Sequence, residues 1–215
     1  YTSLNICGNL VLYFFRFDVG NEGAYSIFAA VAFAAQVLVM MVIPLLRKRF
    51  CKSQLFISGF IIQISGFAVI LIMAFAKLYT PQSWYILCLP GILIYLGYGM
   101  LNVIMTIFLS DSVDYGEVMN GTREESVIFS MQTFTVKLAS GVAVFLAGLV
   151  VDWIHLDTAA AVQTQDTLDA LRMWMTIPSV ILLIVGIFVF KRFYKLDDTR
   201  TVSYTHLRAH ETDQY

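Results

Sequence analysis

The chain has 215 residues, of which 59% are hydrophobic and only 13% are charged. Soluble domains carry about 25% charged residues, so this composition excludes an ordinary soluble protein and indicates an integral protein of the lipid bilayer. The 14 basic and 15 acidic residues give a formal net charge of −1, and no basic patch is interleaved with aromatic residues, which argues against nucleic acid as a partner.

Six apolar segments follow one another along the chain, and each predicts a membrane helix. They lie at 1–15, 24–46, 55–76, 84–109, 127–151 and 171–190. A bilayer core of roughly 30 Å needs about 20 helical residues, so the last five segments are long enough to span it. The first reaches only roughly 22 Å at 1.5 Å per residue, and we expect it to be a truncated span. The expected fold class is therefore an all-α membrane protein, a bundle of six transmembrane helices.

Basic residues between the segments predict the orientation of the bundle. One set follows the second, fourth and sixth segments: Arg47, Lys48, Arg49, Lys52, Arg123, Lys191, Arg192 and Lys195. The other side holds Arg16, Lys77 and Arg172. Because membranes retain basic loops on the cytoplasmic side, we expect the larger set and the C-terminus to be cytoplasmic in a multi-pass plasma-membrane protein.

Two further features of the sequence give no site. Cys7, Cys51 and Cys88 lack the paired spacing of a metal or redox motif, so we expect no metal site and no cofactor there. Residues 199–215 turn abruptly polar, and His206 and His210 have no acidic or cysteine partner in a recognisable motif. We interpret 199–215 as a disordered polar tail, whose amino-acid sequence resembles non-native read-through of vector DNA.

A lysine lies deep in the fifth segment. Lys137 is about ten residues, or some 15 Å, from its start, where a charge costs about 2.5–3.5 kcal/mol on insertion scales. An ideal helix places Ser130, Thr133 and Lys137 on one face, and Gln132 on roughly the opposite face. Lys137 therefore faces either a wet cavity or a buried carboxylate that it pairs with structurally.

Carboxylates gather where the fourth segment ends. Asp111 and Asp114 are three residues apart, so a continuing helix puts both on one side, with Glu117 and Arg123 close behind. Half-solvated ion pairs exchange partners easily, which suits a gate that opens and closes. The alternative is a solvated acidic cap at the membrane edge. Asn102 and Gln63, in the fourth and third segments, either pack between helices or line a cavity.

These residues together resemble a known family. The string Asp111-Ser112-Val113-Asp114-Tyr115-Gly116-Glu117, followed by Arg123, Ser130, Gln132, Thr133 and Lys137, is similar to the glycoside-pentoside-hexuronide:cation symporters, the family of melibiose permease within the major facilitator superfamily. The resemblance covers about residues 1–198 and corresponds to the C-terminal six-helix half of a twelve-helix major facilitator fold.

The resemblance implies symport of a sugar or glycoside with Na⁺, H⁺ or Li⁺, by rocking of two six-helix halves in a bacterial inner membrane. It assigns Asp111, Asp114, Glu117 and Arg123 to a cytoplasmic gate. Lys137, Thr133, Gln132 and Asn102 are assigned to the substrate and cation cavity. The family's cation ligands lie mainly in the N-terminal half, a partner absent from this sequence. Asn102 stands where melibiose permease has a tryptophan, so the implied sugar is not specifically a galactoside.

Other functions remain open from the sequence. One is a related carrier of lipid or another amphipathic solute, and another is a membrane scaffold or sensor that does not transport. An enzyme is not expected, because no set of nucleophile, base and orienting residue is present. By itself, half of a two-bundle carrier is not expected to transport.

Overall fold

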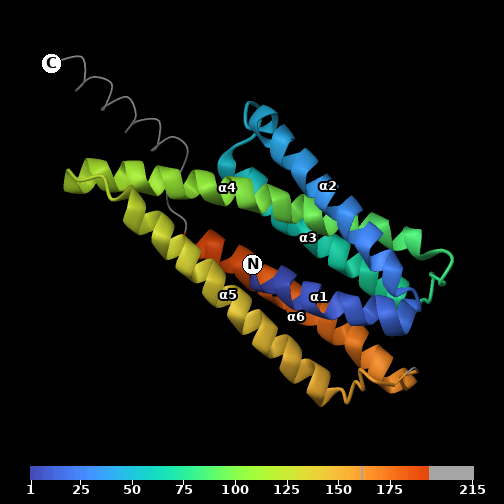
Figure 1. The fold of residues 1–215 in the computed structure, drawn as a ribbon. Helices are drawn as coiled ribbons and strands as arrows, with labels where there is room; N and C mark the ends of the chain where they lie inside the picture. The colour runs from blue at the N-terminus through green and yellow to red at the C-terminus, as the bar shows by residue number, and fades with distance from the viewer. Residues whose placement is uncertain (161, 194–215) are drawn as a thin grey trace.

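The structure is a computed structural model that describes residues 1–160 and 162–193, and its regular elements in that part are all helical (Figure 1). The elements in chain order are α1 (Thr2–Tyr13), the π-helix η1 (Phe14–Val19), α2 (Glu22–Leu46), α3 (Lys52–Phe75), the 3₁₀-helix η2 (Trp84–Leu87), α4 (Cys88–Asn120), α5 (Glu125–Trp153) and α6 (Gln165–Phe193). The predicted tail at 199–215 and Lys195 lie outside the described residues.

Five helices of the described chain are long and apolar enough to cross a membrane. They are Glu22–Leu46, Lys52–Phe75, Trp84–Met119, Glu125–Trp153 and Gln165–Phe193. This confirms the five long segments expected from the sequence, and the protein is an integral, multi-pass, all-α membrane protein. The sixth, α1 with η1, covers only residues 2–19, and length alone does not establish it as a span.

The fourth helix extends further than its apolar segment. The sequence predicted a span ending near Leu109, but α4 continues to Asn120. Gly121 then ends it in the left-handed conformation, with φ of 72°. The carboxylates that follow Leu109 therefore lie on a helix rather than in a loop, where side chains three apart share a face.

Close helix packing holds α4 against α3 and α2. A Cβ at Gly97 would lie 2.5 Å from the carbonyl oxygen of Gly59 on α3, and one at Gly99 would lie 2.6 Å from a methyl group of Val39 on α2. Both distances are shorter than any Cβ contact allows, so glycine is what lets the backbones approach. Small residues at such crossings are typical of membrane helix packing.

The fifth helix packs along only one side. It buries Ala143, Ala147 and Val150, and its contacts are mainly with α1. Figure 1 shows α5 leaving the end of α4 at an angle and running beside α1. Most of the remaining α5 surface in the described chain is uncovered.

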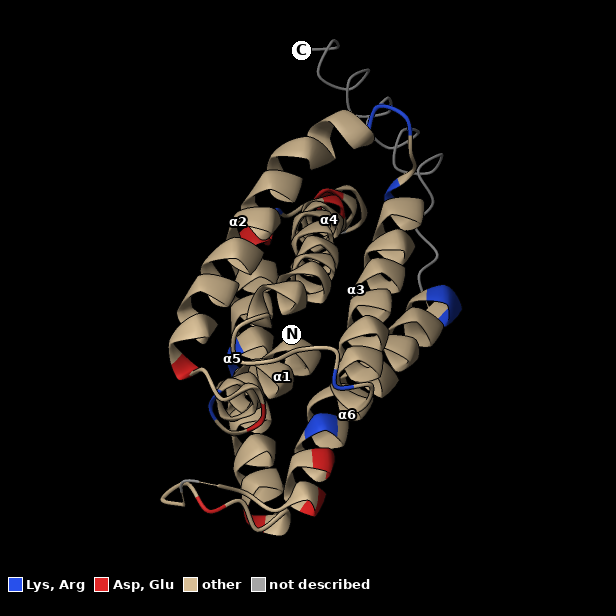
Figure 2. Ribbon diagram, turned by 90° about the vertical axis from the view of Figure 1, so that its right-hand side faces the viewer, with Lys and Arg blue, Asp and Glu red and all other residues tan. Residues whose placement is uncertain are grey.

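Most of the charged residues lie near the two ends of the bundle (Figure 2). We call one the Lys52 end, where α2, α4 and α6 finish and α3 and α5 begin. We call the other the Arg172 end, where η1 and α3 finish and α6 begins. The rings of Phe56 on α3 and Phe190 on α6 are in contact near the Lys52 end, with their centroids 4.5 Å apart and their planes tilted by 50°. This contact places the last turn of α6 beside the first turns of α3.

Candidate functional site

Arg123 gathers three carboxylates in the turn between α4 and α5. Its Nη1 donates to Asp114 Oδ1 at 3.1 Å and to Glu117 Oε2 at 2.9 Å, and its Nε donates to Glu125 Oε2 at 3.1 Å. Asp114 and Glu117 are one turn apart on α4, and the left-handed Gly121 turns the chain back toward them. The hydrogen bonds that Arg123 donates to Glu117 first and then to Glu125 raise the pKa of Arg123. Three of the four residues predicted for the gate therefore meet, with Glu125 added to them.

Asp111, the fourth predicted gate residue, forms an ion pair with a residue outside this cluster. Its Oδ2 accepts from Lys52 Nζ at 2.6 Å, and the two side chains are only 15% and 10% exposed. Lys52 is the first residue of α3, so this pair joins α3 to α4. From the sequence Lys52 was one of four cations in a basic loop, and nothing in its spacing marked it as different.

The predicted cavity face of α5 is open in the described chain. Ser130, Thr133 and Lys137 are all exposed, and a Cβ added at Gly141 would meet nothing within 4 Å. The hydroxyl of Thr133 donates to the Phe129 carbonyl of its own helix. Lys137 forms no hydrogen bond or ion pair with any other described residue. A mid-helix lysine of a membrane span is therefore left on an uncovered face.

Gln132 lies away from that face, as the helical geometry predicted. It lines a hollow of about 410 Å³ between α4 and α5, together with Tyr1, Met105 and Ser112. Thr133 and Lys137 do not line this hollow. The predicted cavity residues of α5 thus divide between two faces of one helix.

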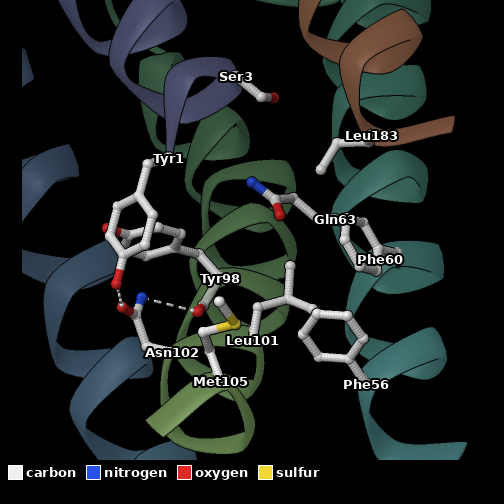
Figure 3. A pocket seen from close by; sticks show the side chains of 10 residues that line it. All are labelled: Tyr1, Ser3, Phe56, Phe60, Gln63, Tyr98, Leu101, Asn102, Met105 and Leu183. Carbon is white, nitrogen blue, oxygen red and sulfur yellow. Dashed lines mark hydrogen bonds between the residues drawn. The ribbon is translucent and has the colours of Figure 1, made fainter. Parts of the chain in front are cut away.

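Asn102 lines a second hollow, of about 140 Å³, among α1, α3, α4 and α6 (Figure 3). Its Oδ1 accepts from the Tyr1 hydroxyl at 2.5 Å, and its Nδ2 donates to the Tyr98 carbonyl at 3.0 Å. Tyr1 and Met105 line both hollows. Within the described chain, the four predicted cavity residues do not form a single site.

Gln63 of α3 adds a buried amide to the hollow of Figure 3. Gln63 is only 2% exposed, and its Oε1 has no hydrogen-bond partner among the described residues. An amide in an apolar helix is visible in the sequence, but its burial and its unsatisfied oxygen are not. A buried acceptor without a donor costs about 1–3 kcal/mol.

The Arg172 end contains a buried charge cluster that sequence reasoning missed. Arg172 of α6 donates through Nε to Asp18 Oδ2 at 2.9 Å and through Nη2 to Asp18 Oδ1 at 2.5 Å. Its Nη1 donates to Asp169 Oδ1 at 2.5 Å, and the Tyr79 hydroxyl donates to Asp18. The pKa of Tyr79 is raised, mainly because its hydroxyl is buried and secondly because it donates a hydrogen bond to Asp18. The cluster joins η1, α6 and the connection before η2.

Residues 1–198 match a family model described as MFS/sugar transport protein. The chain is 25% identical over 197 residues to the uncharacterized symporter YjmB of Bacillus subtilis, which covers 92% of this chain and 41% of that protein. It is 26% identical over 190 residues to an isoprimeverose transporter of Lactiplantibacillus pentosus, covering 87% of this chain and 38% of that protein.

A third relative is a raffinose carrier protein of Pediococcus pentosaceus. The two are 23% identical over 189 residues, which are 86% of this chain and 28% of the carrier. The chain therefore spans less than half the length of each of these three relatives.

Proposed function

The chain belongs to the MFS/sugar transport protein family, and from this premise we propose that it works as one six-helix half of a symporter. The complete carrier would move a sugar or glycoside with Na⁺, H⁺ or Li⁺ by alternating access. Three relatives are named as carriers of isoprimeverose, raffinose and lactose, which supports a glycoside as the substrate class. The other half, with most of the cation ligands, is the principal partner, and no catalytic step is part of the proposal.

Lys137 is the single observation that carries the proposal. It is the thirteenth residue of the 29-residue span α5, counting from Glu125, and it is exposed without a partner among the described residues. A lysine facing lipid at that depth costs about 2.5–3.5 kcal/mol, so its face must meet water or protein. A half-formed wet cavity completed by a second bundle satisfies this requirement, because the second bundle can supply the carboxylate partner.

The chemistry around Lys137 suits a sugar and a cation. Thr133 lies one turn away and offers a hydroxyl, while a lysine favours the ionised form of carboxylates brought close to it. We assign Lys137 to the electrostatics of the cation site and Thr133 to the substrate side. Gln132 and Asn102 stay proposed sugar contacts, reached from the hollows beside Tyr1.

The gate assignment follows the exposure of the charges. Arg123 with Asp114, Glu117 and Glu125 forms exposed ion pairs that can exchange partners as the two halves rock. Asp111 would support this gate from within the bundle, because Lys52 holds it against α3. In this proposal the Lys52 end and the C-terminus face the cytoplasm of a bacterial inner membrane.

Uptake by the complete carrier in proteoliposomes tests the proposal. A panel of labelled glycosides is offered under imposed Na⁺ or H⁺ gradients, with the wild type, Lys137→Ala and the control Lys77→Ala, which removes an exposed lysine from a connection. We expect gradient-driven uptake to fall by about tenfold or more in Lys137→Ala, as loss of about 1.4 kcal/mol would produce, and to persist in Lys77→Ala.

Each alternative function gives a different result in this assay. Uptake that amphipathic lipids compete for and sugars do not would indicate a lipid carrier. No gradient-dependent flux of any solute would indicate a scaffold or sensor. Unchanged coupled uptake in Lys137→Ala would refute the role of that lysine.

A further inference from the structure

Two helices finish at the Lys52 end with the same order of side chains. On α2 the exposed apolar residues Met41, Val42 and Leu45 precede the consecutive cations Arg47, Lys48 and Arg49. On α6 the exposed Phe188 and Val189 precede Lys191 and Arg192. Both helices therefore pass outward from an exposed apolar surface to a cluster of positive charge. Figure 2 shows the two clusters as the blue loop between α2 and α3 and the blue end of α6.

These five cations differ from the cations that are held in charge clusters of the described chain. Lys52, Arg123 and Arg172 each form an ion pair with a carboxylate. None of the five forms an ion pair with a described residue, and all five are exposed. The guanidinium of Arg192 lies 5.7 Å from the ring centre of Phe193, which leaves its positive charge unneutralised. Their counter-charge must come from outside the described chain.

The apolar flanks identify the chemistry of that counter-charge. Phe50, which is 49% exposed, follows directly after Arg49, so apolar surface borders the α2 loop on both sides. The cations need a negative partner at the membrane edge, and the apolar residues of the spans α2 and α6 need acyl chains beside them. A phospholipid satisfies both, because its phosphate reaches the cations while its acyl chains cover the neighbouring apolar residues.

We propose that the α2–α3 loop at Arg47, Lys48 and Arg49, with Lys191 and Arg192 as a second contact, is a binding surface for the headgroups of anionic phospholipids. Contact between the rings of Phe56 and Phe190 holds α6 beside α3, so both clusters belong to the same end of the bundle. A headgroup bound there would hold that end at a constant depth in the membrane. This surface is independent of the sugar site, because it includes none of the residues assigned to the cavity or the gate.

Lipid binding to the purified chain in nanodiscs tests the proposal. The nanodiscs contain zwitterionic phosphatidylcholine with a rising fraction of fluorescent phosphatidylglycerol, and energy transfer from the protein reports enrichment around it. The test variant is Arg47→Gln/Arg49→Gln. The control Arg16→Gln/Lys77→Gln removes the same number of exposed cations from the Arg172 end. Circular dichroism verifies that both variants keep their helices.

We expect the test variant to lose phosphatidylglycerol enrichment by roughly thirtyfold, since each of the two removed cations contributes on the order of 1 kcal/mol near an anionic surface. The control should keep the wild-type enrichment, and added salt should weaken enrichment more in the wild type and the control than in the test variant. Equal enrichment in the two variants would overturn the proposal. Displacement of the lipid by inorganic phosphate at millimolar concentration would also overturn it, since the surface would then be a simple anion site.

Discussion

Two arginines at opposite ends of the bundle hold carboxylates under opposite conditions. Arg123 contacts three carboxylates, and its side chain is 44% exposed. Arg172 contacts Asp18 and Asp169, and its side chain is 4% exposed, as Asp18 is 3%. The number of ion pairs is similar, but the first cluster is in solvent, whereas the Arg172–Asp18 pair of the second is enclosed by protein and only Asp169 is exposed there.

Burial determines what each cluster can do. Exposed ion pairs are worth about 0–1 kcal/mol and exchange partners readily, so Arg123 can release its carboxylates without destabilising the fold. A buried ion pair contributes little net stability relative to an apolar pair of similar size. Removing one partner, however, leaves an uncompensated charge in the protein interior, which destabilises the fold far more than losing an exposed pair. The Arg172 end should therefore stay fixed while the turn between α4 and α5 moves.

The sequence separation of the paired residues differs between the two clusters in the same sense. Asp18 and Arg172 are 154 positions apart, so their contact joins two segments that are distant in the described chain. Arg123 and Asp114 are 9 positions apart, so their contact holds only the turn between α4 and α5. The first cluster holds tertiary structure together, whereas the second orders only a local hairpin.

Arg172→Met is expected to give the largest loss of stability. It leaves the Asp18 carboxylate buried without its cation, so the free energy of unfolding should fall by about 3–5 kcal/mol. Thermal and denaturant unfolding in detergent measure the loss. The control Arg16→Met removes an exposed arginine at the same end and should cost little. Asp18→Asn/Arg172→Met should regain most of the stability because no buried charge remains, and a double variant as unstable as the single one would contradict the argument.

Lys52→Met should give a smaller loss. Asp111 would keep its charge in a site where its side chain is 15% exposed, so water can partly solvate it. We expect the free energy of unfolding to fall by about 2 kcal/mol, in the range for a lost hydrogen bond to a charged group. Lys48→Met, an exposed neighbour in the same loop, is the matched control. An equal loss of stability in the two variants would mean that Asp111 belongs to the exchangeable gate and that its ion pair with Lys52 does not hold α3 to α4.

Tyr79→Phe should cost less again, about 1 kcal/mol at neutral pH, because Asp18 keeps both hydrogen bonds from Arg172. This contribution has a defined pH dependence. The pKa of Tyr79 is raised above the usual value of 10.0 in the fold, so the unfolded chain releases the proton first. The stabilisation is therefore complete below about pH 10 and declines as the pH rises above that value.

Alkaline unfolding curves test the sign of this dependence. The wild type should lose stability above about pH 10 more steeply than Tyr79→Phe, because only the wild type releases this proton on unfolding. Tyr85→Phe removes an exposed hydroxyl nearby and should leave the wild-type slope unchanged. A steeper slope in Tyr79→Phe than in the wild type would mean that Tyr79 does not donate to Asp18.

The sequence was most informative where local chemistry decides the structure. A bilayer allows only helices for long apolar segments, so the five spans were predictable from composition and length. The Arg123 cluster was also predictable in outline, because Asp114 and Glu117 share a helix face and Arg123 follows in a short turn. Hydropathy placed the end of the fourth span near Leu109 because it marks the end of the apolar surface, whereas the helix itself continues to Asn120.

The contacts that sequence reasoning missed join distant segments. Lys52 and Asp111 are 59 positions apart, and Lys52 lies in a run of cations that hydropathy treats alike. Asp18 and Arg172 each lie near the predicted end of a span, where single charges are common and usually solvated. Only the packing of η1 against α6 shows that they are buried together. The roles of the cavity residues stay predictions, because the described chain leaves the face of Lys137 open.

Arg123→Gln should have the smallest effect on global stability and a clear local one. Its carboxylate partners remain solvated, so the melting temperature should not change measurably. The last turns of α4 lose the cation that holds Asp114 and Glu117, so their amide hydrogens should exchange faster while those of α3 and α6 do not. In 1 M salt the Debye length is about 3 Å, and the exchange rates of wild type and variant should converge. Arg123→Lys keeps the charge without the fork that reaches Glu117 and Glu125 together, and it should give intermediate protection. A drop in melting temperature comparable with that of Lys52→Met would instead make the turn between α4 and α5 a fixed part of the fold, and the contrast between the two arginines would disappear.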